Sequence, residues 1–271
     1  MAELKTIIIT GAAHGIGQAI AHLFCEKGWN VIGTSRQSLS PSRSSSRITY
    51  YPLDLTNPLS IDTFVQRVVA DFGGIDVLVN NAGVCLLGPH EELNPEEDHL
   101  IFETNVLGPM RLMRGVLPLM RERGGGRIIS ISSICGGMTL PLYSQYCATK
   151  WAIEGFCEAL AFEVRQHNIL IKIIQPAVFK TGSFENQLAE YNRRPKHPAY
   201  RDFISRVLPN IAAQEKKAPT PEVVAETVWR AANDRSPRLR YRPRSHFILA
   251  ARTLIPTVLY HRFIRRLLNA W

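Results

Sequence analysis

The segment "IIITGAAHGIG", residues 7–17, decides the fold. It begins with a β-branched apolar run, continues with glycines at positions 11, 15 and 17, and leads into a pattern typical of a helix. Gly11 would let the chain turn, Gly15 would let backbone approach a phosphate, and Gly17 would let a helix pack closely on a sheet. The first turn of that helix would offer free N–H groups to a pyrophosphate. The segment therefore predicts the first strand, loop and helix of a dinucleotide-binding fold.

The rest of the chain repeats the alternation of strand and helix patterns. Short apolar runs typical of buried strands lie at residues 5–10, 30–35, 47–53, 75–80, 127–132 and 169–175, and helical patterns lie between and after them at 15–27, 58–71, 95–122, 145–167 and 221–233. This alternation predicts an α/β protein, a Rossmann-type doubly wound parallel sheet. No linker divides the pattern, so residues 1–271 are expected to form a single domain with a C-terminal helical tail. The Ser-rich stretch 38–47 is expected to be a mobile loop.

Charge is concentrated at one end of the chain. The net charge is +9, and the nine arginines from Arg235 onward, with no lysine and no acid among them, account for all of it. This distribution argues against a nucleic-acid-binding domain.

The five cysteines are scattered without metal-ligand spacing, which predicts free thiols in a reducing compartment and no metal site. An apolar run starts almost at once, leaving no room for a signal peptide, so we expect a cytoplasmic protein.

The stretch "YCATK", residues 146–150, places a phenol and an ammonium four residues apart. On a helix these positions share one face. A cation beside a phenol lowers the pKa of the phenol, which makes tyrosine a usable proton donor and acceptor near neutral pH. In isolation the pair is more typical of a half-buried aromatic next to a solvated surface charge, because Y-x-x-x-K arises often by chance.

Three motifs in order, T-G-x-x-x-G-x-G from Thr10, "NNAG" at 80–83 and "YCATK", resemble the short-chain dehydrogenase/reductase family, single-domain branch. The resemblance runs from Thr10 to about Pro176. It implies a catalytic group of Asn105, Ser133, Tyr146 and Lys150, in which Ser133 polarises the substrate carbonyl and Tyr146 transfers the proton. Lys150 would lower the pKa of Tyr146 and bind the nicotinamide ribose, and Asn105 would support a water relay. The resemblance also implies a homodimer or homotetramer.

The cofactor preference rests on the end of the second predicted strand, which faces the adenosine ribose in this fold. Ser35 stands where NAD-using relatives carry an acid, and Arg36 after it could clamp a 2′-phosphate. His14 stands where NADP-using relatives carry a basic residue. These residues favour NADP(H). Arg43 and Arg47 are further candidates for contacting the phosphate.

The remaining cofactor-binding positions follow from the resemblance. Asp54 matches the adenine-contacting aspartate, and Thr181, near Phe179, matches a segment closing over the carboxamide, in which Ala177 replaces a glycine. Asn80 and Asn81 could equally brace the sheet. The full predicted set is Gly11, His14, Gly15, Ile16, Gly17, Ser35, Arg36, Asp54, Leu55, Asn81, Ala82, Gly83, Tyr146, Lys150, Pro176, Phe179 and Thr181.

Residues 182–219 are expected to cover the substrate. Apolar side chains here and before them suggest a pocket for a steroid, retinoid, lipid or aromatic carbonyl compound, although they could equally be packing within the lid. They are Leu86, Leu140, Tyr143, Phe184, Leu188, Tyr191, Tyr200, Phe203 and Ile204. The basic stretch "YNRRPKHP" at 191–198 could instead attract an acidic substrate.

The segment 235–271 combines arginines with apolar residues at helical spacing. Three interpretations of this basic amphipathic tail remain open: packing on the chain's own sheet edge or on a partner subunit, peripheral contact with an anionic membrane, and nucleic-acid binding, which no recognised module supports.

The sequence as a whole predicts an NADP(H)-dependent oxidoreductase that interconverts a carbonyl and an alcohol. The alternative is a catalytically idle NADP-binding sensor or scaffold of the same fold. The complete set Asn105, Ser133, Tyr146 and Lys150 favours the enzyme, because a scaffold need not retain it.

Overall fold

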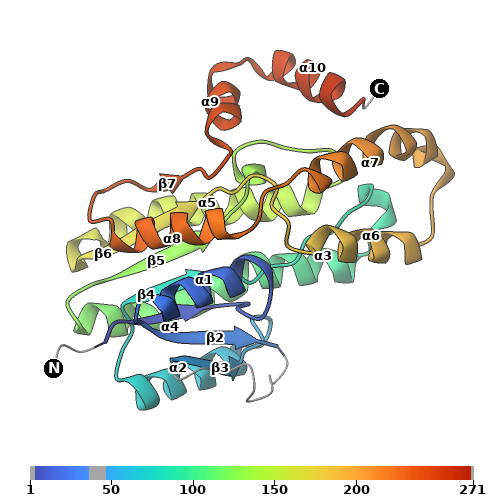
Figure 1. Ribbon diagram of the computed structural model, residues 1–271. Coiled ribbons are helices and arrows are strands. Elements are labelled where there is room, and N and C mark those ends of the chain that lie inside the picture. The colour runs from blue at the N-terminus through green and yellow to red at the C-terminus, as the bar shows by residue number, and fades with distance from the viewer. Residues whose placement is uncertain (1–3, 37–46, 270–271) are drawn as a thin grey trace.

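The computed structural model describes residues 4–36 and 47–269. Its strands form one parallel sheet of seven strands in the order β3-β2-β1-β4-β5-β6-β7 (Figure 1). The strands are β1 (Thr6–Ile9), β2 (Asn30–Ser35), β3 (Ile48–Pro52), β4 (Val77–Asn80), β5 (Gly126–Ile131), β6 (Ile169–Ile174) and β7 (Arg240–Tyr241). The predicted Rossmann-type fold is confirmed. The Ser-rich stretch lies, apart from Arg47, outside the described residues.

Helices cover both faces of the sheet, as Figure 1 shows. Helices α1 and α8 pack on one face through one apolar core, and α2, α4 and α5 pack on the other face through a second core. The helices are α1 (Gly15–Glu26), α2 (Pro58–Phe72), α3 (Pro95–Phe102), α4 (Gly108–Glu122), α5 (Ser144–Val164), α6 (Ser183–Arg193), α7 (Arg201–Lys216), α8 (Glu222–Asn233), α9 (His246–Leu254) and α10 (Thr257–Leu268). The strands between the two layers are apolar along their whole length because both of their faces are buried.

Local signals set where several helices begin. The Asn57 side chain accepts hydrogen bonds from two backbone N–H groups at the start of α2. Asn94 and Glu97 form a reciprocal capping box at the start of α3. Such caps satisfy N–H groups that have no partner within the helix. They therefore help to aim the strand-to-helix loops at the carboxyl edge of the sheet.

Two elements differ from the sequence-based expectation. The helix expected over 95–122 is interrupted by a π-helical turn at Glu103–Leu107, which separates α3 from α4. The sequence analysis missed β7, a two-residue strand parallel to β6 in which Arg240 pairs with Ile173 and Tyr241 with Ile174. The basic tail therefore begins as an edge strand of the chain's own sheet before it becomes helical.

A third apolar core lies outside the sheet and joins the lid to the tail. Phe184 and Tyr191 from α6, Ile211 from α7, and Tyr260 and Ile264 from α10 are among its buried members. In Figure 1 this region stands beyond the carboxyl edge of the sheet. Among the described residues no helix is long and apolar enough to cross a membrane.

Candidate active site

The glycine loop after β1 has the shape that its sequence predicts. Gly11 and Gly15 have positive φ angles of 65° and 53°, which favour glycine. A Cβ atom on Gly17 would lie 2.3 Å from the Gly11 carbonyl oxygen, so a larger residue would push α1 away from the loop. A Cβ atom on Gly15 would lie 3.1 Å from Thr181 Cβ across the loop. The loop is therefore shaped for close approach of its backbone to a bound group.

The loop after β4 is fastened to this glycine loop. The backbone N–H groups of Asn81 and Ala82 both donate to Thr10 Oγ1 at 2.9 Å. The Asn81 side-chain amide donates to the carbonyls of Thr10 at 2.9 Å and Gly11 at 3.2 Å. Asn81 thus braces the two loops, and its backbone remains at the wall of the cavity described next.

One cavity of about 1240 Å³ runs along the carboxyl edge of the sheet. It brings together nearly all of the predicted site residues, from Arg36 at the β2 end to Tyr146 on α5. Those at its wall are Gly11, His14, Gly15, Ile16, Ser35, Arg36, Asp54, Leu55, Asn81, Ala82, Gly83, Ser133, Tyr146, Lys150, Pro176, Phe179 and Thr181. Gly17 and Asn105 do not line it, and each lies behind residues that do.

Tyr146 and Lys150 share one face of α5 at the cavity wall. Lys150 Nζ lies 5.5 Å from the centroid of the Tyr146 ring and donates to the Ile131 carbonyl at 2.9 Å. Ser133 follows β5, where its Oγ accepts from the Cys135 N–H at 3.1 Å and caps the short helix Ile134–Gly136. The three groups predicted to act together thus border the same cavity.

Burial is the largest influence on the Tyr146 phenol, and it raises the pKa well above the ordinary value. Charge interactions with the Cys85 and Cys135 thiols raise this pKa further, whereas a hydrogen bond with Ser133 lowers it. In this structure burial dominates the pKa of Tyr146, and Lys150 donates a hydrogen bond to the Ile131 carbonyl. The expected lowering of the Tyr146 pKa by Lys150 stays a prediction.

Burial also lowers the pKa of Lys150, to about 8. Charge interactions with Cys85, Cys135 and Glu154 oppose this effect without cancelling it. The amine is therefore a weaker base than an exposed lysine, and it stays mostly cationic at neutral pH.

Asn105 lies in the π-helical turn, buried behind the cavity. Its Oδ1 accepts from the Val84 N–H and its Nδ2 donates to the Val84 carbonyl, both at 2.8 Å, and Nδ2 also donates to Thr149 Oγ1 at 3.1 Å. The extra residue of the π turn orients the Asn105 side-chain amide so that it contacts both the loop after β4 and helix α5. Asn105 therefore couples the loop beneath the cofactor region to the helix that carries Tyr146.

Arg36 lies exposed at the carboxyl end of β2, at one end of the cavity. Arg47 does not join it. The Arg47 carbonyl accepts from the Val31 N–H at the start of β2, because parallel strands place the beginning of β3 beside the beginning of β2. The suggestion that Arg47 contacts a 2′-phosphate is therefore wrong, and Arg43 lies outside the described residues.

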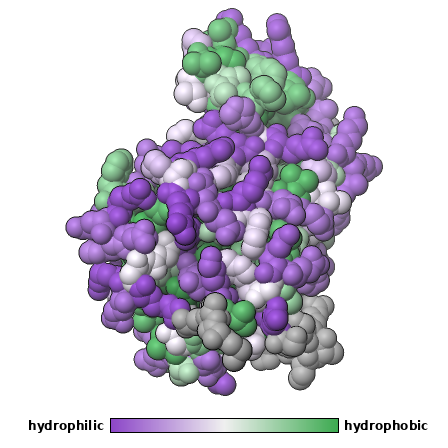
Figure 2. All heavy atoms as spheres, turned by 60° about the vertical axis from the view of Figure 1, so that its left-hand side comes forward, coloured by the Kyte–Doolittle hydropathy of each residue, from purple (hydrophilic) through white to green (hydrophobic). Residues whose placement is uncertain are grey.

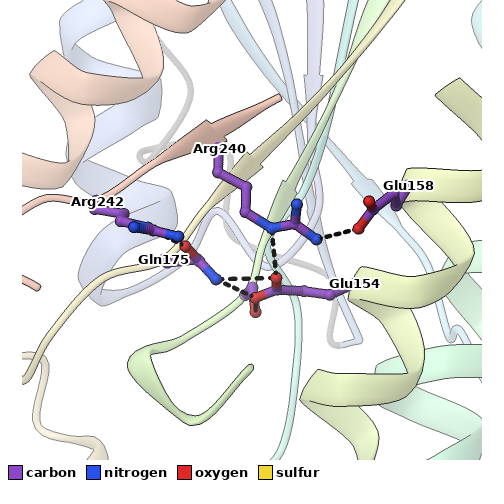
Figure 3. A network of polar contacts seen from close by, with 6 residues as sticks. Glu154, Glu158, Gln175, Arg240 and Arg242 are labelled. Carbon is purple, nitrogen blue, oxygen red and sulfur yellow. Dashed lines mark hydrogen bonds and ion pairs between the residues drawn. The ribbon is translucent and has the colours of Figure 1, made fainter. Parts of the chain in front are cut away.

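A buried polar network, which the sequence analysis missed, joins α5 to Gln175 after β6 and to Arg240 on β7 (Figure 3). Glu154 on α5 accepts from Ser132 Oγ at 2.6 Å and from Gln175 Nε2 at 2.9 Å, and it pairs with Arg240 of β7 at 3.1 Å. The spacing Tyr146, Lys150, Glu154 is i, i+4, i+8 on one helix face, which is the signal that could have revealed it. Ser132 and Ser133 both line the cavity, and the Ser132 hydroxyl also ties the end of β5 to α5 through Glu154.

The lid contributes mainly polar residues to the cavity. Of the nine apolar residues expected to form the pocket, Leu140 and Tyr143 line it, whereas Phe184 and Tyr191 pack in the third core. The lid residues at the cavity wall include Asn186, Gln187, Ile211, Gln214 and Glu215, and Leu268 reaches it from α10. The lid aromatics therefore serve packing, and the sequence analysis missed the carboxyl group of Glu215.

The shape of this cavity fits a nicotinamide dinucleotide. One continuous space joins Arg36 to Tyr146 along the glycine loop. Gly11 to Ile16 would hold the pyrophosphate, Asp54 and Leu55 the adenine, and Lys150 and Thr181 the nicotinamide end. Asp54 is already fixed for such a contact, because its Oδ1 accepts from the Thr56 N–H and hydroxyl at 2.9 Å and 2.8 Å.

Comparison with known proteins agrees with this geometry. The family described as short chain dehydrogenase matches residues 5–192. A 3-ketodihydrosphingosine reductase of Bacteroides thetaiotaomicron is 34% identical over 237 residues, which cover 87% of this chain and 86% of that protein. A short-chain dehydrogenase from Streptomyces avermitilis superposes with a TM-score of 0.82 at 31% identity, covering 98% of this chain and 97% of the other. ElxO with NADP bound superposes with a TM-score of 0.73 at 28% identity, over 89% of this chain and 98% of the other.

The family match covers most of the chain, the relatives are named reductases and dehydrogenases, and the cavity is built for a dinucleotide at the edge where such folds bind one. The chain therefore belongs to the short-chain dehydrogenase family, whose members are oxidoreductases that use nicotinamide cofactors.

Proposed function

We propose that this protein is an NADP(H)-dependent reductase of an amphiphilic ketone or aldehyde, with Tyr146 as the proton donor. The observation that carries the proposal is the meeting of Ser133, Tyr146 and Lys150 at the wall of a cavity that reaches Arg36. When bound, the cofactor supplies the hydride. The chain supplies the carbonyl-polarising hydroxyl of Ser133 and the proton of Tyr146.

Reduction is the proposed direction of the reaction. Tyr146 would donate its proton to the alkoxide that develops on the carbonyl oxygen. Ser133, which faces the same space, would hold the carbonyl oxygen beside that phenol. Lys150 remains mostly cationic and would hold the ribose of the cofactor next to them.

The wall of the substrate end supports an amphiphilic substrate. Leu140, Tyr143, Ile211 and Leu268 make it partly apolar, and Glu215 adds one carboxyl group. Such a wall suits an apolar chain that carries a hydrogen-bond donor. The name of the Bacteroides relative, 3-ketodihydrosphingosine reductase, supports a ketone on a lipid-like skeleton.

The proposal is tested by Tyr146→Phe, assayed by NADPH absorbance on a panel of steroid, retinoid, long-chain and aromatic carbonyl compounds. We expect kcat to fall by about 10²–10⁴-fold, because a positioned proton donor contributes about that much. Binding of NADPH, followed by its fluorescence, should change little. The matched control is Tyr143→Phe, which removes the neighbouring phenol, whose ring centroid lies 6.3 Å away. Equal kcat values for wild type and Tyr146→Phe, or NADPH binding without any turnover in the wild type, would refute the proposed role.

The cofactor preference is tested by Arg36→Ala. Loss of charge-assisted hydrogen bonds to a 2′-phosphate should raise the KM for NADPH by about tenfold or more, while the KM for NADH changes little. Arg47→Ala is the matched control, because Arg47 lies at the opposite end of β2. Similar effects of Arg36→Ala on both cofactors would exclude the phosphate clamp.

A further inference from the structure

The tail helices α9 and α10 carry large apolar side chains on their outer surface. Phe247 is 89% exposed, Leu254 is 84% exposed and Val258 is 64% exposed. The complete exposed set is Phe247, Leu254, Ile255, Val258, Leu259, Phe263 and Leu267. Figure 2 shows apolar side chains gathered at the top of the molecule, over this tail, with hydrophilic ones beside them.

Helix α10 has two apolar stripes with different surroundings. Tyr260, Ile264 and Leu268 are buried against the body of the protein. Leu259, Phe263 and Leu267 repeat the same i, i+4, i+8 spacing one position earlier, and all three are exposed. One stripe therefore suffices to dock the helix, and the second has no partner among the described residues.

Positive charge borders the exposed stripe. Arg262 and Arg266 lie one turn apart, which puts them on the side of α10 opposite the buried stripe and next to the exposed one. No acid occurs from residue 235 to the end of the chain. Among the described residues no carboxylate forms an ion pair with Arg262 or Arg266.

We propose that α9 and α10 form a docking surface for a lipid bilayer that carries anionic headgroups. Exposed apolar side chains bordered by arginines are the pattern of helices that lie in the membrane interface, with the apolar side chains among the acyl chains and the arginines at the phosphates. At 12 residues, α10 is about 18 Å long. That length suits lying along the interface rather than spanning a hydrocarbon core of about 30 Å.

Charge argues for lipid over a second copy of this chain. A two-fold interface would bring the same surface of both copies together, so arginines would face arginines with no acid in either tail. An anionic bilayer complements both the charge and the apolar stripe. Leu268 on the neighbouring buried stripe of α10 also lines the active-site cavity, so adsorption would bring the substrate end of the cavity close to the lipid.

The test is co-sedimentation of the full-length protein with vesicles of phosphatidylcholine alone and with vesicles that contain about 30% phosphatidylserine. Wild type should bind the anionic vesicles preferentially and should lose most of this binding between about 0.15 M and about 1 M salt. Arg262→Gln with Arg266→Gln should lower the partition coefficient about fivefold for each arginine removed. Leu259→Ser with Phe263→Ser should lower it about tenfold or more.

The matched control combines Leu59→Ser on α2 with Arg121→Gln on α4, two exposed positions far from the tail in the chain, and it should bind as wild type does. Circular dichroism checks that each variant is folded. Equal binding of wild type to both vesicle types, or no effect of either tail variant, overturns the proposal. The proposal is also overturned if the wild type is an oligomer that does not bind vesicles and Leu259→Ser with Phe263→Ser converts it to a monomer. The exposed stripe would then be an interface between copies of this chain. These outcomes do not depend on the proposed reaction, since no substrate or cofactor is present.

Discussion

Glu215 is a carboxyl group at the wall of a cavity that polar and apolar residues line together. Burial raises its pKa to about 7, and charge repulsion from Glu185 adds to that effect. Among the described residues it has no ion-pair partner. A substrate with a hydrogen-bond donor would relieve this desolvation, so Glu215 joins Ser133 and Tyr146 as a residue through which the cavity can select its ligand.

The Glu215→Gln variant should change how stability depends on pH. In the unfolded chain a glutamate loses its proton near pH 4.3, whereas native Glu215 holds it to about pH 7. Between these two pH values native Glu215 holds a proton that the unfolded chain has lost, so the free energy of unfolding falls as pH rises. Above about pH 7 this loss of stability is complete and stays constant. We expect Glu215→Gln to raise Tm relative to wild type more at about pH 8 than at about pH 4, as measured by calorimetry. The exposed Glu122→Gln serves as control, and a Tm difference independent of pH would contradict this account.

At the scale of elements, the active site depends on how α5 is held against the ends of β5, β6 and β7. Glu154 receives hydrogen bonds from Ser132 after β5 and from Gln175 after β6, and an ion pair from Arg240 on β7 (Figure 3). Arg240 also pairs with Glu158 one turn later on α5 at 2.5 Å. A strand of two residues gains little stability from its few backbone hydrogen bonds to the neighbouring strand. The side-chain contacts of Arg240 therefore anchor β7 and the tail that follows.

Arg240→Met should therefore destabilise the fold. Glu154 would keep its buried charge without its cation, and breaking such a pair costs about 3 kcal/mol of unfolding free energy. The measurement is urea unfolding monitored by tryptophan fluorescence. Arg235→Met, at an exposed arginine before β7, should change the unfolding free energy by less than about 0.5 kcal/mol. Combining Arg240→Met with Glu154→Gln should recover part of the loss, and a purely additive result would speak against coupling.

At the scale of the whole molecule, the lid and the tail form one unit around the third core. Tyr260 donates from its hydroxyl to the Thr139 carbonyl, and the Thr139 N–H donates back to it at 3.2 Å. The Asn210 side chain on α7 donates to the Leu268 carbonyl at 3.1 Å. A groove of about 530 Å³ remains between α10 and α5, and Cys147 lies at its wall beneath Tyr260 and Ile264.

Alkylation of Cys147 can report whether the tail stays docked. A hydrogen bond with Cys135 lowers the pKa of the Cys147 thiol, which favours its reaction with an alkylating reagent, but the side chain is only 4% exposed. Ile264→Ser weakens the buried stripe of α10 and should speed alkylation of the peptide that contains Cys147 by about tenfold or more, read by mass spectrometry. Phe263→Ser, on the exposed stripe, should leave the rate unchanged. Equal rates in all three proteins would mean that the tail does not protect this thiol.

Short-range patterns in the sequence were enough to predict the fold class and most of the cavity wall. The glycine spacing from Gly11 to Gly17 and the i, i+4 spacing of Tyr146 and Lys150 are local, and backbone geometry translates them directly into a loop and a helix face. The roles assigned to these residues stay predictions until the variants above are assayed. Burial raises the pKa of Tyr146, and burial cannot be read from the spacing of two residues.

The sequence by itself determined the alternation of strands and helices, the glycine loop and the shared helix face of Tyr146 and Lys150, since each follows from periodicity or from contacts within one turn or loop. Only the tertiary structure decided that Arg47 lies away from Arg36, that Glu154 meets Arg240 across 86 positions, and that Glu215 and Leu268 reach the cavity. Such contacts join segments far apart in the chain, and their energies depend on which groups are removed from water together. No local sequence pattern shows which groups are buried together. These contacts and pKa shifts could therefore be found only from the folded arrangement of sheet, lid and tail.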